Sequence, residues 1–94
     1  MRIRWSFEAL SDLESIRAYI AQERPAAARK IALRIREAAM RLERFPLSGR
    51  RGRVAGTREL IVPGTSYICA YTVQSDEVRI AAVLHGKRLW PETF

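Results

Sequence analysis

The sequence predicts an α+β domain in which a helical hairpin packs on a small, mostly antiparallel sheet. Two long segments in the N-terminal half carry apolar residues at helical spacing, and a short alternating segment precedes them. The C-terminal half contains three short segments that are rich in β-branched and aromatic residues and are separated by turn sequences. The expected order is therefore β-α-α-β-β-β, in a single domain that covers residues 1–94.

The N-terminal half is expected to hold one strand and two helices. Residues 2–5 alternate polar and apolar side chains, which predicts a strand with Ile3 and Trp5 facing inward. Ser6 is a suitable N-cap for a helix over residues 7–23. Pro25 suits the first turn of a second helix, which its apolar stripe extends to about residue 45. Because one or two residues separate the helices, they must fold back as an antiparallel hairpin.

The C-terminal half is expected to form a meander of strands after an exposed loop. Residues 47–56 are rich in Gly, Ser and Arg, as is typical of a loop. The segment 67–73 is almost wholly apolar and predicts a central strand in which Cys69 is a small buried residue. The three expected strands are Thr57–Val62, Tyr67–Val73 and Val78–Leu84.

The charge balance points to an anionic partner. The chain has 17 Lys and Arg against 10 Asp and Glu, a net charge of +7, which favours nucleic acid, an acidic protein segment or a membrane surface. No apolar run approaches the roughly 20 residues of a membrane-spanning helix, so the membrane is the weakest of these. One Cys and one His exclude an internal disulfide and a Cys-rich zinc site. We therefore expect no metal, no cofactor and a reducing, cytoplasmic setting.

Two arginine-rich or lysine-rich surfaces are candidates for binding. The loop and the strand after it carry Arg50, Arg51, Arg53 and Arg58 with no acidic residue before Glu59, and guanidinium groups suit phosphates and carboxylates. The second expected helix carries Lys30, Arg34, Arg41 and Arg44 along one side. Each set is either a solvated surface or a docking site for an acidic partner.

The segment after the last strand is a third candidate. It contains His85, Lys87, Arg88 and Trp90. A histidine works as a general acid or base near neutral pH, although one at a strand end is more often a structural hydrogen-bonding residue. No Gly-rich phosphate loop, catalytic triad or paired carboxylates accompany it, so a binding function is favoured over catalysis.

The chain resembles the RelE/ParE family of bacterial toxins along its whole length. The resemblance rests on the order and spacing of these elements: Ala9, Asp12-Leu13, Ile16 and Tyr19-Ile20; Pro25; Leu42, Phe45-Pro46 and Gly49-Arg50; Gly56-Thr57-Arg58-Glu59-Leu60; Tyr67 and Tyr71; and Val83-Leu84-His85-Gly86-Lys87-Arg88 with Trp90-Pro91. It implies a toxin that an antitoxin neutralises. RelE-like members cut mRNA in the ribosomal A site, and ParE-like members inhibit DNA gyrase, so the fold alone does not decide the activity.

One position favours the ParE-like branch. RelE-type nucleases carry an arginine in a Tyr-Arg-Leu-x-Tyr pattern, where it stabilises charge on the scissile phosphate. The matching stretch here reads Tyr-Ile-Cys-Ala-Tyr, and Ile68 cannot do this. A gyrase inhibitor that binds its target is therefore expected. The alternatives are a ribosome-dependent mRNA endonuclease and a family member that has lost toxicity and only binds its antitoxin.

Each hypothesis names its residues. The candidates for binding the toxin's target are Arg50, Arg51, Arg53, Arg58, His85, Lys87, Arg88 and Trp90. A nuclease would use Arg58, Glu59, His85 and Lys87. The resemblance also implies a ParD-like antitoxin that contacts DNA and folds an acidic C-terminal segment on the toxin, in a hetero-oligomeric complex. The candidates for binding this antitoxin are Trp5, Lys30, Arg34, Arg41 and Arg58.

Overall fold

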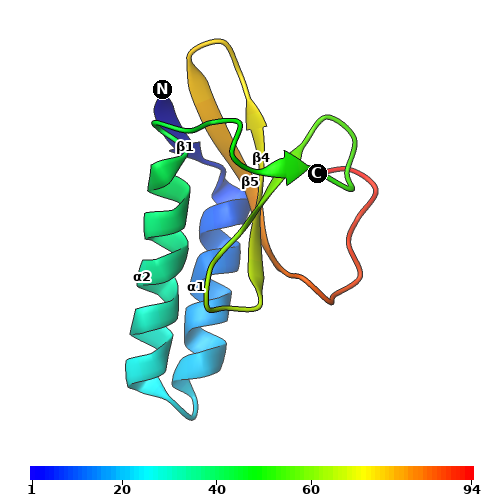
Figure 1. The fold of residues 1–94 in the computed structure, drawn as a ribbon. Coiled ribbons are helices and arrows are strands. Elements are labelled where there is room, and N and C mark those ends of the chain that lie inside the picture. The colour runs from blue at the N-terminus through cyan, green and yellow to red at the C-terminus, as the bar shows by residue number, and fades with distance from the viewer.

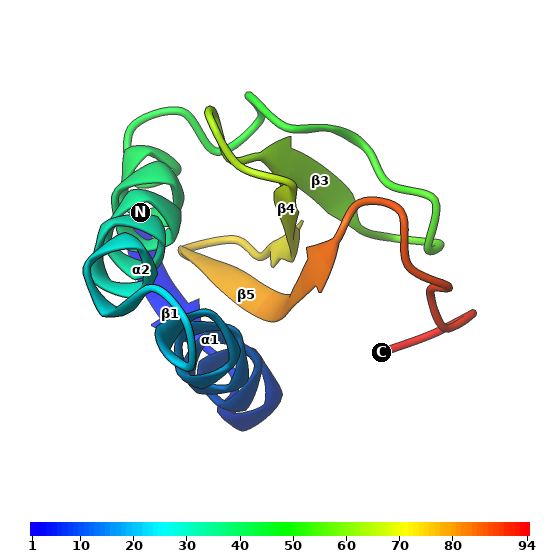
Figure 2. The ribbon, with the colours of Figure 1, turned by 90° about the horizontal axis from the view of Figure 1, so that it is seen from below.

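The computed structural model describes all 94 residues as two antiparallel helices on one face of a five-stranded sheet (Figures 1 and 2). The elements are β1 (Arg2–Trp5), α1 (Phe7–Ala21), α2 (Pro25–Arg41), β2 (Arg50–Arg51), β3 (Arg58–Ile61), β4 (Tyr67–Val73) and β5 (Glu77–His85). The strand order is β1-β5-β4-β3-β2. Only the β1–β5 pair is parallel. The predicted α+β class and the order of the main elements are confirmed.

Local sequence signals explain how the helices begin. The Ser6 side chain accepts a hydrogen bond from the N–H of Ala9 at 3.0 Å and caps α1. Pro25 is the first residue of α2, where its missing N–H costs nothing. Both helices end earlier than predicted, α1 at Ala21 and α2 at Arg41, because their last turns loosen into hydrogen-bonded turns rather than continuing the helix.

The core lies between the helical hairpin and the sheet face that it covers. The largest fully buried side chains include Tyr71, Ile35, Leu42 and Ile80. Ile3 and Trp5 pack against this core, as predicted, and so does Leu60. Cys69 is completely buried, and burial raises the pKa of its thiol to about 12.

The segment between α2 and β3 is more ordered than its composition predicts. It contains the two-residue strand β2, which pairs with β3, and Val54 within it is buried. The prediction of an exposed loop over residues 47–56 is therefore wrong in part. The cause is Tyr71, whose hydroxyl accepts from the Gly49 N–H at 2.9 Å and donates to the Pro46 carbonyl at 2.8 Å. These bonds fasten the start of the segment to the sheet.

No helix combines the length and the apolar character that crossing a membrane requires.

Candidate functional site

The predicted site residues lie on two opposite faces of the sheet. Successive side chains of a strand point to opposite faces. On β3, Leu60 packs against the core beneath the helices, so Arg58 shares the helix-covered side and Glu59 lies on the other, open side. On β5, Val83 belongs to the core, so His85 also points to the helix side. The sheet itself therefore separates His85 from Glu59.

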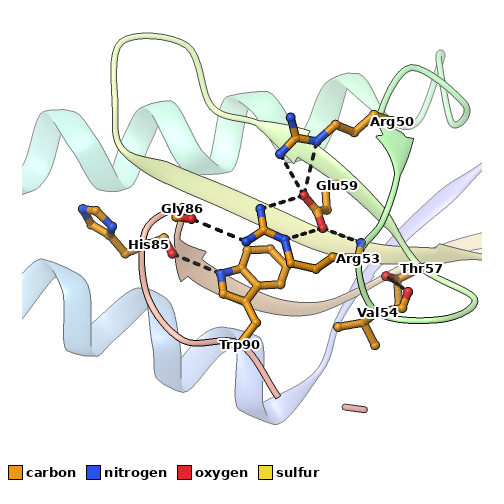
Figure 3. A network of polar contacts seen from close by, with 8 residues as sticks. All are labelled: Arg50, Arg53, Val54, Thr57, Glu59, His85, Gly86 and Trp90. Carbon is orange, nitrogen blue, oxygen red and sulfur yellow. Dashed lines mark hydrogen bonds and ion pairs between the residues drawn. The ribbon is translucent and has the colours of Figure 1, made fainter. Parts of the chain in front are cut away.

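A buried carboxylate organises the open face (Figure 3). Only 2% of the Glu59 side chain is exposed, and its two oxygens receive Arg50 Nη2 at 2.9 Å and Arg53 Nε at 3.0 Å. The backbone N–H of Arg53 adds a bond of 2.7 Å. Burial raises the pKa of Glu59, but the hydrogen bonds from Arg53 and Arg50 outweigh it and hold the pKa below its usual value. Glu59 is therefore an ionised anchor for two of the predicted target-binding arginines.

The chain after β5 folds back over this cluster. The Trp90 ring lies on the Arg53 guanidinium, 3.8 Å from the ring centroid to Cζ, and its indole N–H donates to the His85 carbonyl at 3.2 Å (Figure 3). Arg53 also reaches the Gly86 carbonyl at 3.5 Å. The arginine loop (residues 49–53) and the C-terminal tail (residues 86–94) thus meet on the open face, although they are far apart in the sequence.

Arg58 is engaged with the loop rather than presented to solvent as a free cation. Its Nη1 donates to the carbonyl of Gly49 at 2.8 Å and lies 3.4 Å from that of Leu47. By contrast, the side chains of Arg51, Lys87 and Arg88 make no hydrogen bond or ion pair. These three exposed cations remain available to a phosphate or a carboxylate.

His85 lies in a groove between α1 and the end of β5. Its ring meets the ring of Tyr67 edge-on, with centroids 5.7 Å apart, and its Nδ1 accepts from the Lys87 N–H at 3.1 Å. The groove has a volume of about 740 Å³ and is lined by Asp12, Ser15, Ile16, Tyr19, Tyr67, Val83, Leu84, His85, Lys87 and Arg88. This volume is within the range of ligand-binding pockets.

Asp12 is a groove residue that the sequence pattern does not reveal. Its Oδ2 accepts from the Val83 N–H at 3.0 Å, which ties α1 to β5. Burial raises the pKa of Asp12, and the bond from Val83 opposes that rise only in part. Asp12 lies in a mixed polar and apolar stretch of the first helix, and no local pattern shows that it reaches the β5 backbone 71 positions away.

The basic side of α2 forms a separate, shallower surface. Arg34, Glu37 and Arg41 line a hollow of about 370 Å³ with the turn between β3 and β4. Arg34 Nη1 lies 3.5 Å from the Gly64 carbonyl, and Lys30 is exposed one turn earlier. Trp5, in the edge strand β1, is half-buried against the core. The predicted antitoxin-binding residues therefore do not form one continuous patch.

Comparison with known proteins identifies the family. Residues 3–90 match the family model described as the ParE toxin of the type II toxin-antitoxin system parDE. The chain belongs to the ParE toxin family. It is thus a toxin of a type II toxin-antitoxin system, as the resemblance implied.

Two relatives of this ParE-family toxin cover nearly the whole chain. Y4kP of Sinorhizobium fredii, named as a candidate toxin, is 42% identical over 99% of this chain and 96% of its own. The toxin RelE2 of Caulobacter vibrioides is 40% identical over 94% of this chain and 98% of its own.

Solved structures share the fold. A chain of the chromosomal ParDE toxin-antitoxin system from P. aeruginosa superposes with a TM-score of 0.80 at 24% identity, over 88% of this chain and 92% of that one. A chain of the YoeB dimer from Staphylococcus aureus superposes with a TM-score of 0.59 at 18% identity, over 87% of this chain and 92% of that one.

Of the four residues that a nuclease would use, only His85 and Lys87 share a site, the groove beside α1, in this ParE-family toxin. Glu59 is held by two arginines on the open face, His85 points into the groove on the other face, and Arg58 binds loop carbonyls. Ile68, at the position of the nuclease arginine, faces the open side and is 6% exposed. No cation replaces it within β4, whose residues are Tyr-Ile-Cys-Ala-Tyr-Thr-Val.

Proposed function

We propose that this toxin arrests growth by binding and inhibiting DNA gyrase, without chemistry of its own, and that a ParD-like antitoxin neutralises it. The observation that carries the proposal is the separation of Glu59 from His85 by the sheet, with Ile68 where a nuclease needs arginine. General acid–base chemistry on RNA requires such groups within hydrogen-bonding reach of one substrate. A binding mechanism has no such requirement.

The cations without partners are the proposed contacts with the target. Arg51 lies in β2 at one edge of the sheet, and Lys87 and Arg88 follow β5 and line the groove beside α1. Glu59 binds Arg50 and Arg53, and the Trp90 ring lies on Arg53. These contacts hold the loop and the tail in place. Target binding by this surface would leave the core and the helices undisturbed.

A supercoiling assay with antitoxin-free toxin tests the proposal. Wild type should inhibit gyrase, and the triple substitution of Arg51, Lys87 and Arg88 by Gln should weaken inhibition by about tenfold or more, because several charged contacts are lost together. The matched control replaces Arg24, Arg29 and Arg36, three exposed arginines of the helical hairpin, by Gln and should inhibit as wild type does. Folded wild-type toxin with no effect on gyrase contradicts the proposal.

The second candidate is a ribosome-dependent endoribonuclease. The +7 net charge and the 40% identity to a protein named toxin RelE2 favour it. This hypothesis requires that the toxin cut mRNA on translating ribosomes, and that His85→Ala or Arg58→Ala abolish the cutting. Such cuts, without any effect on supercoiling, would replace the gyrase proposal.

A further inference from the structure

The two helices of the hairpin carry opposite charge. In α2 the charged residues are five cations, Arg29, Lys30, Arg34, Arg36 and Arg41, and one acid, Glu37, whereas α1 holds one cation and three acids. The helices lie side by side (Figure 1), yet none of the ion pairs of the structure includes a residue of α2. The positive charge of α2 is therefore not used to hold the fold together.

Three of these cations form a basic row along one side of α2. Lys30, Arg34 and Arg41 follow one another at intervals of four and seven residues, so they share one side of the helix. All three residues are exposed. With a rise of about 1.5 Å per residue, the basic row is about 16 Å long. It is a line of cations on a rigid element.

The basic row borders a polar hollow where α2 meets the turn between β3 and β4. The hollow, about 370 Å³ in volume, is lined by Arg34, Glu37, Arg41, Pro63 and Gly64. Arg34 Nη1 lies 3.5 Å from the Gly64 carbonyl, and the other guanidinium nitrogens of Arg34 make no hydrogen bond. A guanidinium that one contact positions and that keeps free donors suits a phosphate.

Gly64 allows the turn to approach Arg34 closely. Its φ is +75°, and a Cβ at this position would collide with Arg34 Nη1. Any other residue here would therefore strain the turn and push the guanidinium away from it. The glycine thus preserves the arrangement of Arg34 at the hollow.

This surface is separate from the groove and from the C-terminal tail. The residues that line the hollow include none of those that line the groove beside α1. In Figures 1 and 2, α2 and the tail, drawn in red, lie on opposite sides of the molecule. A ligand on the basic row therefore leaves the proposed gyrase contacts uncovered.

The composition of α2 indicates the class of ligand. Single-stranded nucleic acid is bound through aromatic side chains on which the bases stack, and α2 has no aromatic residue. Protein partners are held by buried aromatic or apolar anchors, and the lining of the hollow has no aromatic or large aliphatic side chain. A line of cations without such anchors matches the regularly spaced phosphates of a duplex.

We propose that the basic row of Lys30, Arg34 and Arg41 binds the phosphate backbone of duplex DNA, with one phosphate in the hollow between Arg34 and Arg41. Phosphates follow at about 3.4 Å along each strand, so the basic row spans about five base pairs. The inference rests on the proposed function in its choice of DNA, because gyrase holds duplex DNA. It adds a second surface, with which the toxin contacts DNA while it binds gyrase.

Fluorescence anisotropy with a labelled duplex of about 20 base pairs, which is longer than the basic row, tests the site. Wild-type affinity should fall steeply with salt, because each phosphate contact adds about 0.9 to the slope of log affinity against log salt. The triple substitution of Lys30, Arg34 and Arg41 by Gln should lower this slope by about 2–3 and weaken binding by more than about tenfold in 0.1 M salt.

The matched control replaces Arg24, Arg29 and Arg36 by Gln. It removes the same net charge from exposed positions of the hairpin, and none of the three residues lines the hollow. The control should lower the salt slope by less than about 1. Equal losses in the two triple variants would mean that DNA responds to net charge alone, and they would overturn the site.

Glu37 gives a second test, in which binding should improve. It is the one group of the hollow that repels a phosphate. Glu37→Gln should therefore tighten DNA binding by about threefold or more, because a nearby like charge is removed. Glu23→Gln changes the net charge equally at an exposed position outside the hollow and should have little effect. If both variants tighten binding alike, no phosphate occupies the hollow.

The outcomes separate this inference from the proposed function. Toxin that inhibits gyrase but does not bind the duplex overturns DNA binding and leaves the gyrase proposal standing. Toxin that binds DNA through the basic row but has no effect on gyrase supports the DNA site and contradicts the gyrase proposal. A triple variant of the basic row that binds DNA normally and the antitoxin more weakly assigns the surface to an acidic protein and overturns the inference. Tighter binding of a duplex RNA of the same sequence overturns the choice of DNA.

Discussion

At the scale of single residues, the alternation of β3 separates a structural ion cluster from the groove. Glu59 is buried between Arg50 and Arg53, whose own side chains are 53% and 40% exposed. Removal of the carboxylate leaves two arginines that water still reaches, so the loss of stability is smaller than when a fully buried ion pair is broken. The arginine loop nevertheless loses the group that holds it on the sheet.

We expect Glu59→Gln to destabilise the toxin by about 1–3 kcal/mol, since charge-assisted bonds to a buried acceptor are lost. The folded-state pKa of Glu59 is lowered, so this stability is present above the unfolded pKa and is lost as pH falls through the folded value. Chemical denaturation should therefore show that the variant and the wild type differ in their free energy of unfolding at neutral pH and differ less in acid. Glu14→Gln is the control, because the pair of Glu14 with Arg17 is exposed to solvent and contributes little to stability. Equal losses in both variants would contradict the buried anchor.

At the scale of elements, the C-terminal tail depends on a few contacts of Trp90. Its ring covers the Arg53 guanidinium, its N–H binds the His85 carbonyl, and it lies near Phe94 at 6.4 Å between centroids. Leu89, immediately before it, is 99% exposed. One side chain therefore fixes the direction of the tail.

Trp90→Ala should release the tail while the rest of the fold persists. We expect faster amide exchange and proteolysis over residues 87–94, with a loss of global stability of about 1–2 kcal/mol from the cation–π contact and the lost hydrogen bond. Leu89→Ala is the control, because it removes a neighbouring side chain that is fully exposed. It should change neither the protection of the tail nor the global stability. A tail that stays protected in Trp90→Ala would show that other contacts hold it.

The elements themselves follow from local patterns, whereas the site follows from contacts across the chain. The spacing of apolar residues, the Ser6 cap and Pro25 at the start of α2 suffice for both helices, and the alternation in β3 packs Leu60 against the core. That alternation also separates Arg58 from Glu59, although the nuclease hypothesis had grouped them. The bond from Tyr71 to Gly49 spans 22 positions, and no spacing rule predicts it.

At the scale of the whole molecule, the net charge of +7 is divided among surfaces with different tasks. Arg50, Arg53 and Arg58 are used within the fold, and the cations at the end of β5 and on α2 face solvent. Charges exposed to solvent speed the approach of an anionic partner more than they strengthen the final complex. An acidic antitoxin segment would therefore associate with this toxin faster than a neutral one.

The association rate of toxin and antitoxin should consequently depend on salt. Screening shortens electrostatic reach from about 10 Å at 0.1 M salt to about 3 Å at 1 M. We expect the association rate constant, measured by stopped flow, to fall about tenfold over that range, while the dissociation rate constant, which depends on short-range contacts, changes less. The triple substitution of Arg51, Lys87 and Arg88 by Gln should flatten this dependence. An association rate that ignores ionic strength would mean that the excess charge acts on the toxin's target and not on the capture of its antitoxin.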